Sequence, residues 1–220
     1  MGIFSFLRRR PKYAYTINET EALEAYIEKQ YGEIETVFHE LKSPDIHLDI
    51  YVIKLTEQEN YYKLVTVGVG AYQMQVPQNL QGLGMDRAEL VIFLPSHWNI
   101  KGIKDVDYWP IRMMKQIGRL PILCNTWIGE GHSIASEEGK PYAENTKLNS
   151  CFLLCARAED GAAQSVLLPS GKKVRFYQIV PAYREEMDYK LENGCNALVQ
   201  RMIENGVDMV IDPNRKNVCK

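Results

Sequence analysis

Two short stretches of the sequence carry the side chains best suited to chemistry. His47 and Asp49 are separated by one residue in an alternating segment, so in a strand both side chains lie on the same face. Downstream, WIGEGHS places Glu130 and His132 close to Trp127, with a glycine on each side of the acid. Because imidazole and carboxylate groups bind zinc and transfer protons, both stretches are candidates for a functional site.

Two interpretations of these groups stay open. If folding brings His132 to His47 and Asp49, the three side chains could serve a metal-dependent or acid–base hydrolase, since a catalytic zinc takes three protein ligands and keeps one open position. Against this, the sequence contains no ligand-spaced motif such as H-E-x-x-H or C-x-x-C. The alternative is a hydrogen-bonded polar corner that stabilises packing. We expect no bound metal, no cofactor and no catalytic residue.

Other suggestive motifs have simpler explanations. Gly68-Val-Gly70 is not followed by a helix with a phosphate-binding pattern, so we do not expect it to bind a nucleotide. Cys151 and Cys155 share one face of a predicted strand, where a free cysteine behaves as a small apolar side chain. The five cysteines are odd in number and scattered, which is typical of reduced thiols in the cytoplasm.

The composition is that of a globular protein in water. Of the 220 residues, 45% are apolar and 25% are charged, which is ordinary for a soluble domain. A net charge of −2 provides no basic footprint for nucleic acid. No apolar run approaches the roughly 18 residues that a membrane span needs. We expect a cytoplasmic chain that binds no nucleic acid and has no membrane span.

Proline and glycine mark the predicted helices. Trp109-Pro110 is typical of a first helical turn, and Leu120-Pro121 is expected to end the same helix, because the residue before a proline avoids helical geometry. Pro181 and Gly194 frame another helix in the same way. The predicted helices are 19–31 (with a capping box at Asn18 and Glu21), 109–120, 181–193 and 197–204.

Alternation of apolar and polar residues predicts the strands. In IHLDIYVIKL, one face is apolar from Ile46 to Val52, and the other face is partly polar. A short gap to YYKLVTVGVG indicates an antiparallel meander. Residues 33–41 fit a helix or a strand equally. The predicted strands are 46–55, 61–70 with a continuation at 71–76, 87–94, 149–156, 165–168, 173–181 and an edge strand at 207–212.

These elements indicate one α+β domain. Strands in a run, with helices at the flanks, favour a central, mostly antiparallel or mixed β-sheet with flanking helices over an alternating parallel fold. The chain has no repeats and no linker-like stretch. We expect a flexible basic N-terminal tail over residues 1–15, a single domain over residues 16–212 and a C-terminal tail over residues 213–220.

A family resemblance adds to the prediction of an α+β domain. The ordered segments that carry it are SPDIHLDIYVI, YYKLVTVGVG, RAELVIFLP, the helix at Trp109-Pro110, TWIGEGHS, ENTKL and FYQIVPAYREEMDYKLENG. Over about residues 31–212 they resemble the suppressor of fused family domain. The chain looks like a compact bacterial form, which ends before the second, C-terminal domain of the animal relative. In that relative the two domains clamp a peptide of a Gli-type transcription factor as an added strand.

The resemblance implies a fold and a class of function. The fold is an α+β sandwich similar to the N-terminal domain of the animal relative, and the function is non-enzymatic protein binding. A protein or peptide partner is expected. A toxin is one candidate, because an inhibitor or immunity role has been proposed for bacterial relatives. The oligomeric state stays open. Residues placed in the partner-binding or structural polar corner are His47, Asp49, Tyr72, Trp127, Glu130, His132, Asn145 and Thr146.

Overall fold

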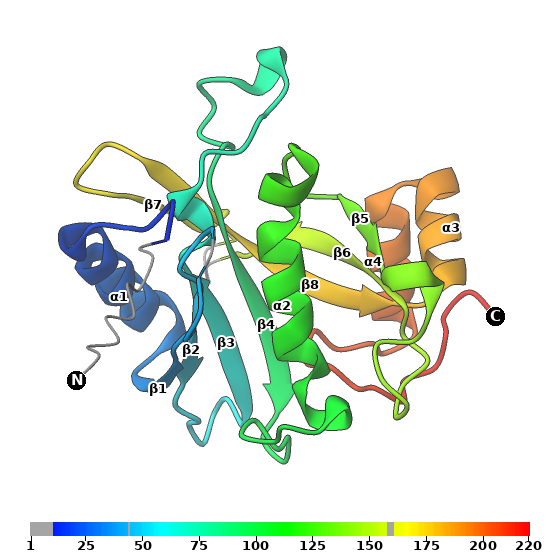
Figure 1. The fold of residues 1–220 in the computed structure, drawn as a ribbon. Helices are drawn as coiled ribbons and strands as arrows, with labels where there is room; N and C mark the ends of the chain where they lie inside the picture. Colours follow the sequence, from blue (N-terminus) through cyan, green and yellow to red (C-terminus); the bar gives the residue numbers. More distant parts are fainter. Residues whose placement is uncertain (1–10, 44, 158–160) are drawn as a thin grey trace, which may run out of the picture.

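The computed structural model describes residues 11–43, 45–157 and 161–220. In these ranges one mixed sheet has the order β1-β2-β3-β4-β8-β6-β5, and β7 pairs with β8 beside this path. All pairs are antiparallel except β4 with β8, which confirms the expected α+β fold with a mostly antiparallel sheet (Figure 1). The strands are β1 Ile34–Phe38, β2 Asp49–Ile53, β3 Tyr61–Val67, β4 Ala88–Pro95, β5 Ser133–Ala135, β6 Ser150–Cys155, β7 Ser165–Leu167 and β8 Lys173–Ala182.

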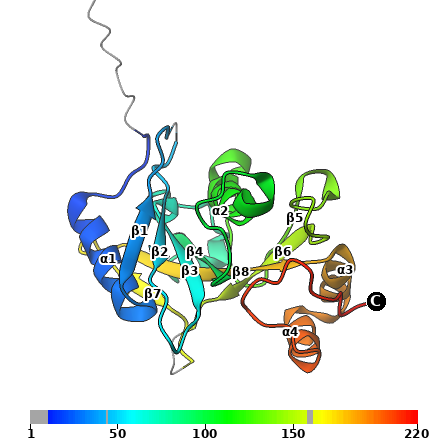
Figure 2. The same cartoon turned by 90° about the horizontal axis from the view of Figure 1, so that it is seen from below.

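Helices cover both faces of the sheet, so the predicted sandwich is present (Figure 2). Helix α2 packs on one face, and α1 and the α3–α4 pair pack on the other face at opposite ends of the sheet. No helix in the described ranges is long and apolar enough to cross a membrane. The helices are α1 Ile17–Tyr31, α2 Asp105–Cys124, α3 Arg184–Asn193 and α4 Cys195–Glu204, with 3-10 turns at Val69–Ala71, Gln78–Leu80 and Glu137–Gly139.

Strand β2 is buried on both faces, which corrects the expectation of a polar second face. Ile50 packs in the core under α2, as the alternation predicts. On the other face, Tyr51 and Ile53 pack against Leu23 and Ile27 of α1. Each such side chain contributes about 1.5–3 kcal/mol of hydrophobic stabilisation when fully buried. The polar character of this face is therefore confined to the beginning of the strand.

Helix α2 starts earlier and ends later than the prolines suggested. It begins at Asp105, so Pro110 lies inside the helix. A proline has no N–H to donate, which leaves the carbonyl of Val106 without its helical partner. The Nδ2 of Asn145 donates to this carbonyl at 3.2 Å and replaces the missing bond. Pro121 lies in the last turn, and the helix continues to Cys124.

Other boundaries also differ from the expectation. Helix α1 has its capping box at Thr16 and Glu19 instead of Asn18 and Glu21. The ambiguous segment 33–41 contains strand β1, which pairs with β2. The segment 71–76 does not continue β3, because the chain turns at Val69–Ala71 and then runs as a loop.

The end of the domain differs as well. Pro181 lies in β8, and α3 begins only at Arg184. The expected edge strand at 207–212 is reduced to a single bridge between Val210 and Phe93.

Both expected tails are partly docked on the domain. Tyr13 forms a bridge with Ile46, and residues 1–10 of the N-terminal tail lie outside the described residues. At the other end, Arg215 forms an ion pair with the fully buried carboxylate of Glu186. Val218 is 7% exposed and packs in the core under α3 and α4. Packing therefore extends beyond the expected boundaries at residues 16 and 212.

The turn at Gly68-Val-Gly70 binds a carboxylate that belongs to the chain itself. The N–H groups of Gly68 and Gly70 each donate to Glu89 Oε1 at 3.0 Å. Thr66 donates to Oε2 at 2.6 Å, and Tyr15 donates to Oε1 at 2.9 Å. Gly68 has a φ of 131°, and a Cβ on it would lie 1.8 Å from the carbonyl oxygen of His47, so only glycine fits. The turn is an anion site that is already filled.

Replacing Glu89 by Gln should destabilise the fold. The amide carries two N–H donors where the protonated carboxyl group carries one O–H, which leaves at least one buried donor unpaired. We expect the free energy of unfolding to fall by about 1–2 kcal/mol at pH 5, measured by urea denaturation. The matched control is Glu35→Gln on the exposed side of β1, where the change should stay within about 0.5 kcal/mol.

The same substitution predicts a pH dependence. Burial raises the pKa of Glu89 to about 7, although hydrogen bonds from Thr66, Gly70, Gly68 and Tyr15 oppose the shift. Between the unfolded pKa near 4.5 and the folded pKa near 7, the folded state keeps a proton that the unfolded state has lost. The wild-type protein therefore loses stability as the pH rises through this range. Glu89→Gln should therefore cost more at pH 5 than at pH 8, by up to about 3 kcal/mol. Equal costs at both pH values would contradict this.

Candidate functional site

The predicted polar corner is divided between two ends of the sheet. His47 lies just before β2, and His132 lies just before β5. Strands β3, β4, β8 and β6 lie between them. Five strand spacings correspond to about 24 Å, which is too far for the two imidazoles to share a ligand. The expected combination of His47, Asp49 and His132 is therefore not brought together.

At the β1–β2 end, a second histidine takes the place of His132. His39 Nδ1 lies 2.8 Å from Asp49 Oδ2, and His47 Nε2 lies 3.3 Å from Asp49 Oδ1. The three ligand atoms lie within 4.8 Å of one another. The side chain of Asp49 is 11% exposed, whereas those of His39 and His47 are 67% and 42% exposed. The carboxylate is thus held inside, with the imidazoles at the surface.

Sequence reasoning missed His39 because it left residues 33–41 unassigned. The antiparallel register pairs Phe38 with Ile50. Continuing that register by one residue places His39 opposite Asp49. Had the sequence predicted a strand at β1, paired as a hairpin with β2, it would have identified His39.

Hydrogen bonds from neighbouring residues hold His47 and Asp49 in place. The N–H of Glu40 donates to Asp49 Oδ1 at 2.9 Å. Arg119 of α2 donates to both carboxylate oxygens of Glu40 at 2.7 Å and to Asp45 at 3.1 Å. Ser43 Oγ lies 2.9 Å from His47 Nδ1. The helix on the face of the sheet therefore positions the loop that carries the histidine.

At the other end of the sheet, the loop between α2 and β5 is packed around Trp127. The rings of Trp127 and His132 meet edge to face with centroids 4.2 Å apart. A Cβ at Gly129 would lie 2.6 Å from the Trp127 ring, which explains the first glycine of the GEG motif. Burial lowers the pKa of His132, and the charge of Lys190 lowers it further, so the imidazole is neutral at pH 7.

Lys190 of α3 ties this loop to the helix. Its side chain is buried, and the ammonium donates to Gly131 O at 2.6 Å and to Ser133 Oγ at 2.8 Å. Glu130 points elsewhere: it accepts a bond from Cys155 Sγ at 3.2 Å. Burial, followed by the Glu130 carboxylate, raises the pKa of Cys155 to about 11, so its thiol is protonated at neutral pH and a poor nucleophile.

The remaining predicted residues satisfy neighbouring groups. Asn145 supplies the bond to α2 described above, and Thr146 Oγ1 donates to Pro213 O at 2.7 Å. Thr146 also accepts from the N–H of Leu148 at 3.1 Å. Tyr72 packs edge to face on Tyr13 with ring centroids 5.0 Å apart. Asn145 and Thr146 are therefore supports of the fold, and Tyr72 packs on the segment that precedes α1.

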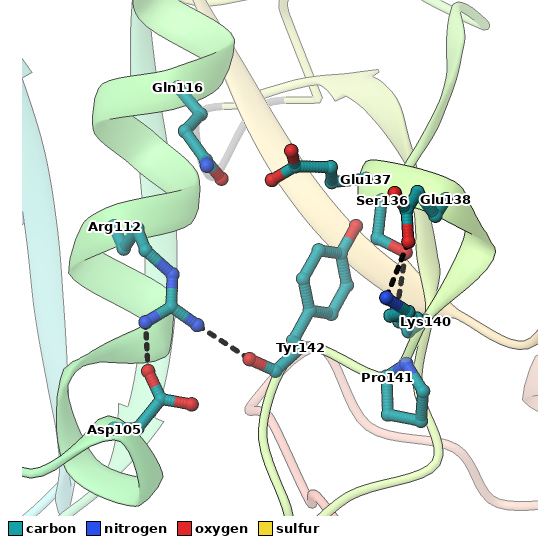
Figure 3. A pocket seen from close by; sticks show the side chains of 9 residues that line it. All are labelled: Asp105, Arg112, Gln116, Ser136, Glu137, Glu138, Lys140, Pro141 and Tyr142. Carbon is teal, nitrogen blue, oxygen red and sulfur yellow. Dashed lines mark hydrogen bonds and ion pairs between the residues drawn. The ribbon is translucent and has the colours of Figure 1, made fainter.

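A charged groove lies between α2 and the segment that follows β5 (Figure 3). Its volume is about 510 Å³. Arg112 on its α2 side bonds to Asp105 and donates to the carbonyl of Tyr142 at 2.5 Å. Below it, the ring of Tyr142 stacks on buried Trp109 with centroids 5.4 Å apart. The lining residues are Asp105, Arg112, Gln116, Ser136, Glu137, Glu138, Lys140, Pro141 and Tyr142. The sequence did not reveal this groove, because its walls come from separate segments.

The groove is next to an end of the sheet. Strand β5 has three residues and pairs only with β6 in the described sheet. Two of its residues, Ser133 and Ala135, are exposed. An edge strand offers unpaired N–H and C=O groups to another chain.

Several solved structures share this fold. A putative suppressor of fused homologue from Neisseria gonorrhoeae superposes with a TM-score of 0.62 at 15% identity, covering 92% of this chain and 98% of that one. The Sufu–Fu complex matches with a TM-score of 0.64 at 14% identity, covering 95% and 93%. Drosophila Suppressor of Fused gives 0.60 at 14% identity, and the match spans 91% of this chain but 51% of the fly protein. The fold is therefore the α+β sandwich of suppressor of fused proteins.

The sequence places the chain in the same family. The family model for Suppressor of fused protein matches residues 44–216, and the chain belongs to the suppressor of fused family. An uncharacterised protein of Ureaplasma parvum is 26% identical over 225 residues, covering 94% of this chain and 99% of that protein. The two bacterial relatives are thus matched over nearly their full lengths, and the resemblance to a compact bacterial form is confirmed.

Replacing Lys190 by Met should loosen the loop around Trp127. The methionine keeps the apolar stem but leaves the partly buried carbonyl of Gly131 without this donor, which costs about 1 kcal/mol. We expect faster amide hydrogen exchange at Gly131 and His132, measured by NMR. Lys101→Met, at an exposed position, is the control and should leave both rates unchanged. Unchanged exchange in the Lys190 variant would show that the loop is held by other contacts.

Proposed function

We propose that this chain is a non-enzymatic protein-binding domain that holds a segment of a partner protein. The observation that carries the proposal is membership of the suppressor of fused family, together with the shared fold of the Sufu–Fu complex, in which a relative binds Fu. The finer part of the proposal is that the chain acts in the cytoplasm as an inhibitor or immunity protein, with a toxin as a candidate partner.

The free edge of β5 and the groove beside it support a binding site for an extended segment. A peptide can add to a sheet edge through main-chain hydrogen bonds, while pockets beside the edge select its side chains. In the groove, Lys140 pairs with Glu138 and Arg112 pairs with Asp105, and Glu137 adds a further carboxylate. Such a mixed lining favours a partner segment that carries both charges in a matching order.

The predicted residues around Trp127 lie at the beginning of this edge. Glu130 is partly exposed within this loop, whereas His132 is neutral and packed against Trp127. In this proposal Glu130 contacts the partner, while His132 and Trp127 set the direction in which β5 leaves the loop. Asn145 and Thr146 support the fold through their hydrogen bonds to backbone carbonyls. No observation favours the alternative hydrolase, because its three groups lie at two ends of the sheet.

Site-specific crosslinking tests this placement. A photoreactive amino acid is placed at Ala135 in β5 or at Glu137 in the groove, both exposed positions. In lysate from the cells that produce the chain, we expect both positions to crosslink the same protein, identified by mass spectrometry. The purified partner should then bind the wild-type chain in isothermal titration calorimetry.

The matched control carries the same photoreactive group at Glu192, which is exposed on α3. It should give no such product. If the partner crosslinks equally from Glu192, or only from there, binding occurs through another face. A partner that is chemically changed by the wild-type chain would contradict the non-enzymatic role.

A further inference from the structure

We propose that His39, His47 and Asp49 bind a divalent transition-metal ion, with Zn²⁺ as the ion that best fits the ligand set. This site lies at the end of the sheet opposite to β5 and does not depend on the proposed protein-binding function. Two imidazole nitrogens and one carboxylate are ligands that zinc takes in proteins, with an open position left for water or a further ligand. The ligand atoms of all three residues lie within 4.8 Å of one another.

The spacing of the ligand atoms fits a zinc ion. Bonds of about 2.0–2.2 Å in a tetrahedral site place neighbouring ligand atoms about 3.3 Å apart. His47 Nε2 lies 3.3 Å from Asp49 Oδ1. His39 Nδ1 lies 2.8 Å from the other carboxylate oxygen, Asp49 Oδ2, so binding one zinc ion among the three groups requires the His39 side chain to move outward. Its side chain is 67% exposed, so little packing opposes the movement.

The hydrogen bonds of His47 identify which nitrogen is free to bind. Ser43 Oγ donates its single hydrogen to Glu40 Oε2 at 3.0 Å, because the carboxylate can only accept. The contact of 2.9 Å between Ser43 Oγ and His47 Nδ1 must then be donated by the imidazole. In the neutral ring, Nε2 consequently carries the lone pair and faces the carboxylate of Asp49. A cation between these two acceptor atoms, which lie 3.3 Å apart, would turn the contact into a favourable one.

A proton or a metal ion can supply that cation. A proton on Nε2 would give a charged imidazolium and an ordinary ion pair with Asp49. A zinc ion would satisfy Nε2, Asp49 and His39 together. With zinc bound at Nε2, His47 Nδ1 keeps its hydrogen bond to Ser43. A hydrogen bond on the other ring nitrogen is the usual way in which proteins orient a histidine ligand.

The surrounding contacts hold the ligands before any ion binds. Asp49 is buried at the beginning of β2 and receives the N–H of Glu40. Glu40 is itself fixed by two bonds from Arg119 of α2. This arrangement reduces the freedom that the loop loses on binding. Only His39 keeps substantial freedom, so it is expected to close the site.

Titration of the metal-free full-length chain with ZnCl₂ tests the site, using isothermal titration calorimetry. We expect one Zn²⁺ per chain. His39→Ala and His47→Ala should each weaken binding by more than about 100-fold, and Ser43→Ala, which removes the outer bond, by about 10-fold. Circular dichroism checks that each variant is folded; His39 is exposed, so its removal should not affect folding.

The chain offers matched controls, because its other two histidines lie outside the site. His97→Ala and His132→Ala should bind Zn²⁺ as the wild type does. Co²⁺ provides a second measurement: the spectrum should show visible bands of a tetrahedral nitrogen and oxygen site. Absence of Zn²⁺ binding in the wild type, binding that survives loss of His39 and His47, or thiolate charge-transfer bands from the cysteines would each overturn the proposal.

Discussion

The parallel pairing of β4 with β8 is the constraint on which the remaining structure depends. It joins the antiparallel meander β1–β4 to the antiparallel group around β6 and β8. Glu89 lies in this pairing, and its carboxylate also fixes the turn after β3 and the segment before α1. Because α2 packs across the same central strands, it reaches both ends of the sheet: Arg119 supports the histidine group, and Arg112 forms a wall of the groove.

Much of the fold could be predicted, because burial leaves a local signature in the sequence. The alternation around Ile50 and the apolar run of β4 have the period of strands, and they were placed nearly correctly. The boundaries of α2 could not be read in the same way. Pro110 loses a hydrogen bond inside the helix, and Asn145 replaces it from a loop far along the chain. A rule based on helix propensity takes account of the proline but not of the distant asparagine that replaces its hydrogen bond.

The candidate site shows the same division between local and distant information. His47 and Asp49 could be placed together because a strand brings every second side chain to one face. Sequence reasoning considered only His132 as their third neighbour and missed His39, which the fold places beside them. Strand order decides this question, and strand order comes from tertiary packing. The Gly68–Gly70 turn binds the carboxylate of Glu89, and this partner could not be identified without the fold.

The central pairing has a consequence for the synthesis of the chain. Ala88 of β4 pairs with Arg175 of β8, so β4 is complete long before its partner leaves the ribosome. At about 5–20 residues per second, one side of an apolar strand waits for several seconds. During this interval the AELVIFLP segment resembles an exposed sheet edge that other nascent chains could join. The single carboxylate in it, Glu89, is then ionised in water and opposes such association, before the finished fold encloses it.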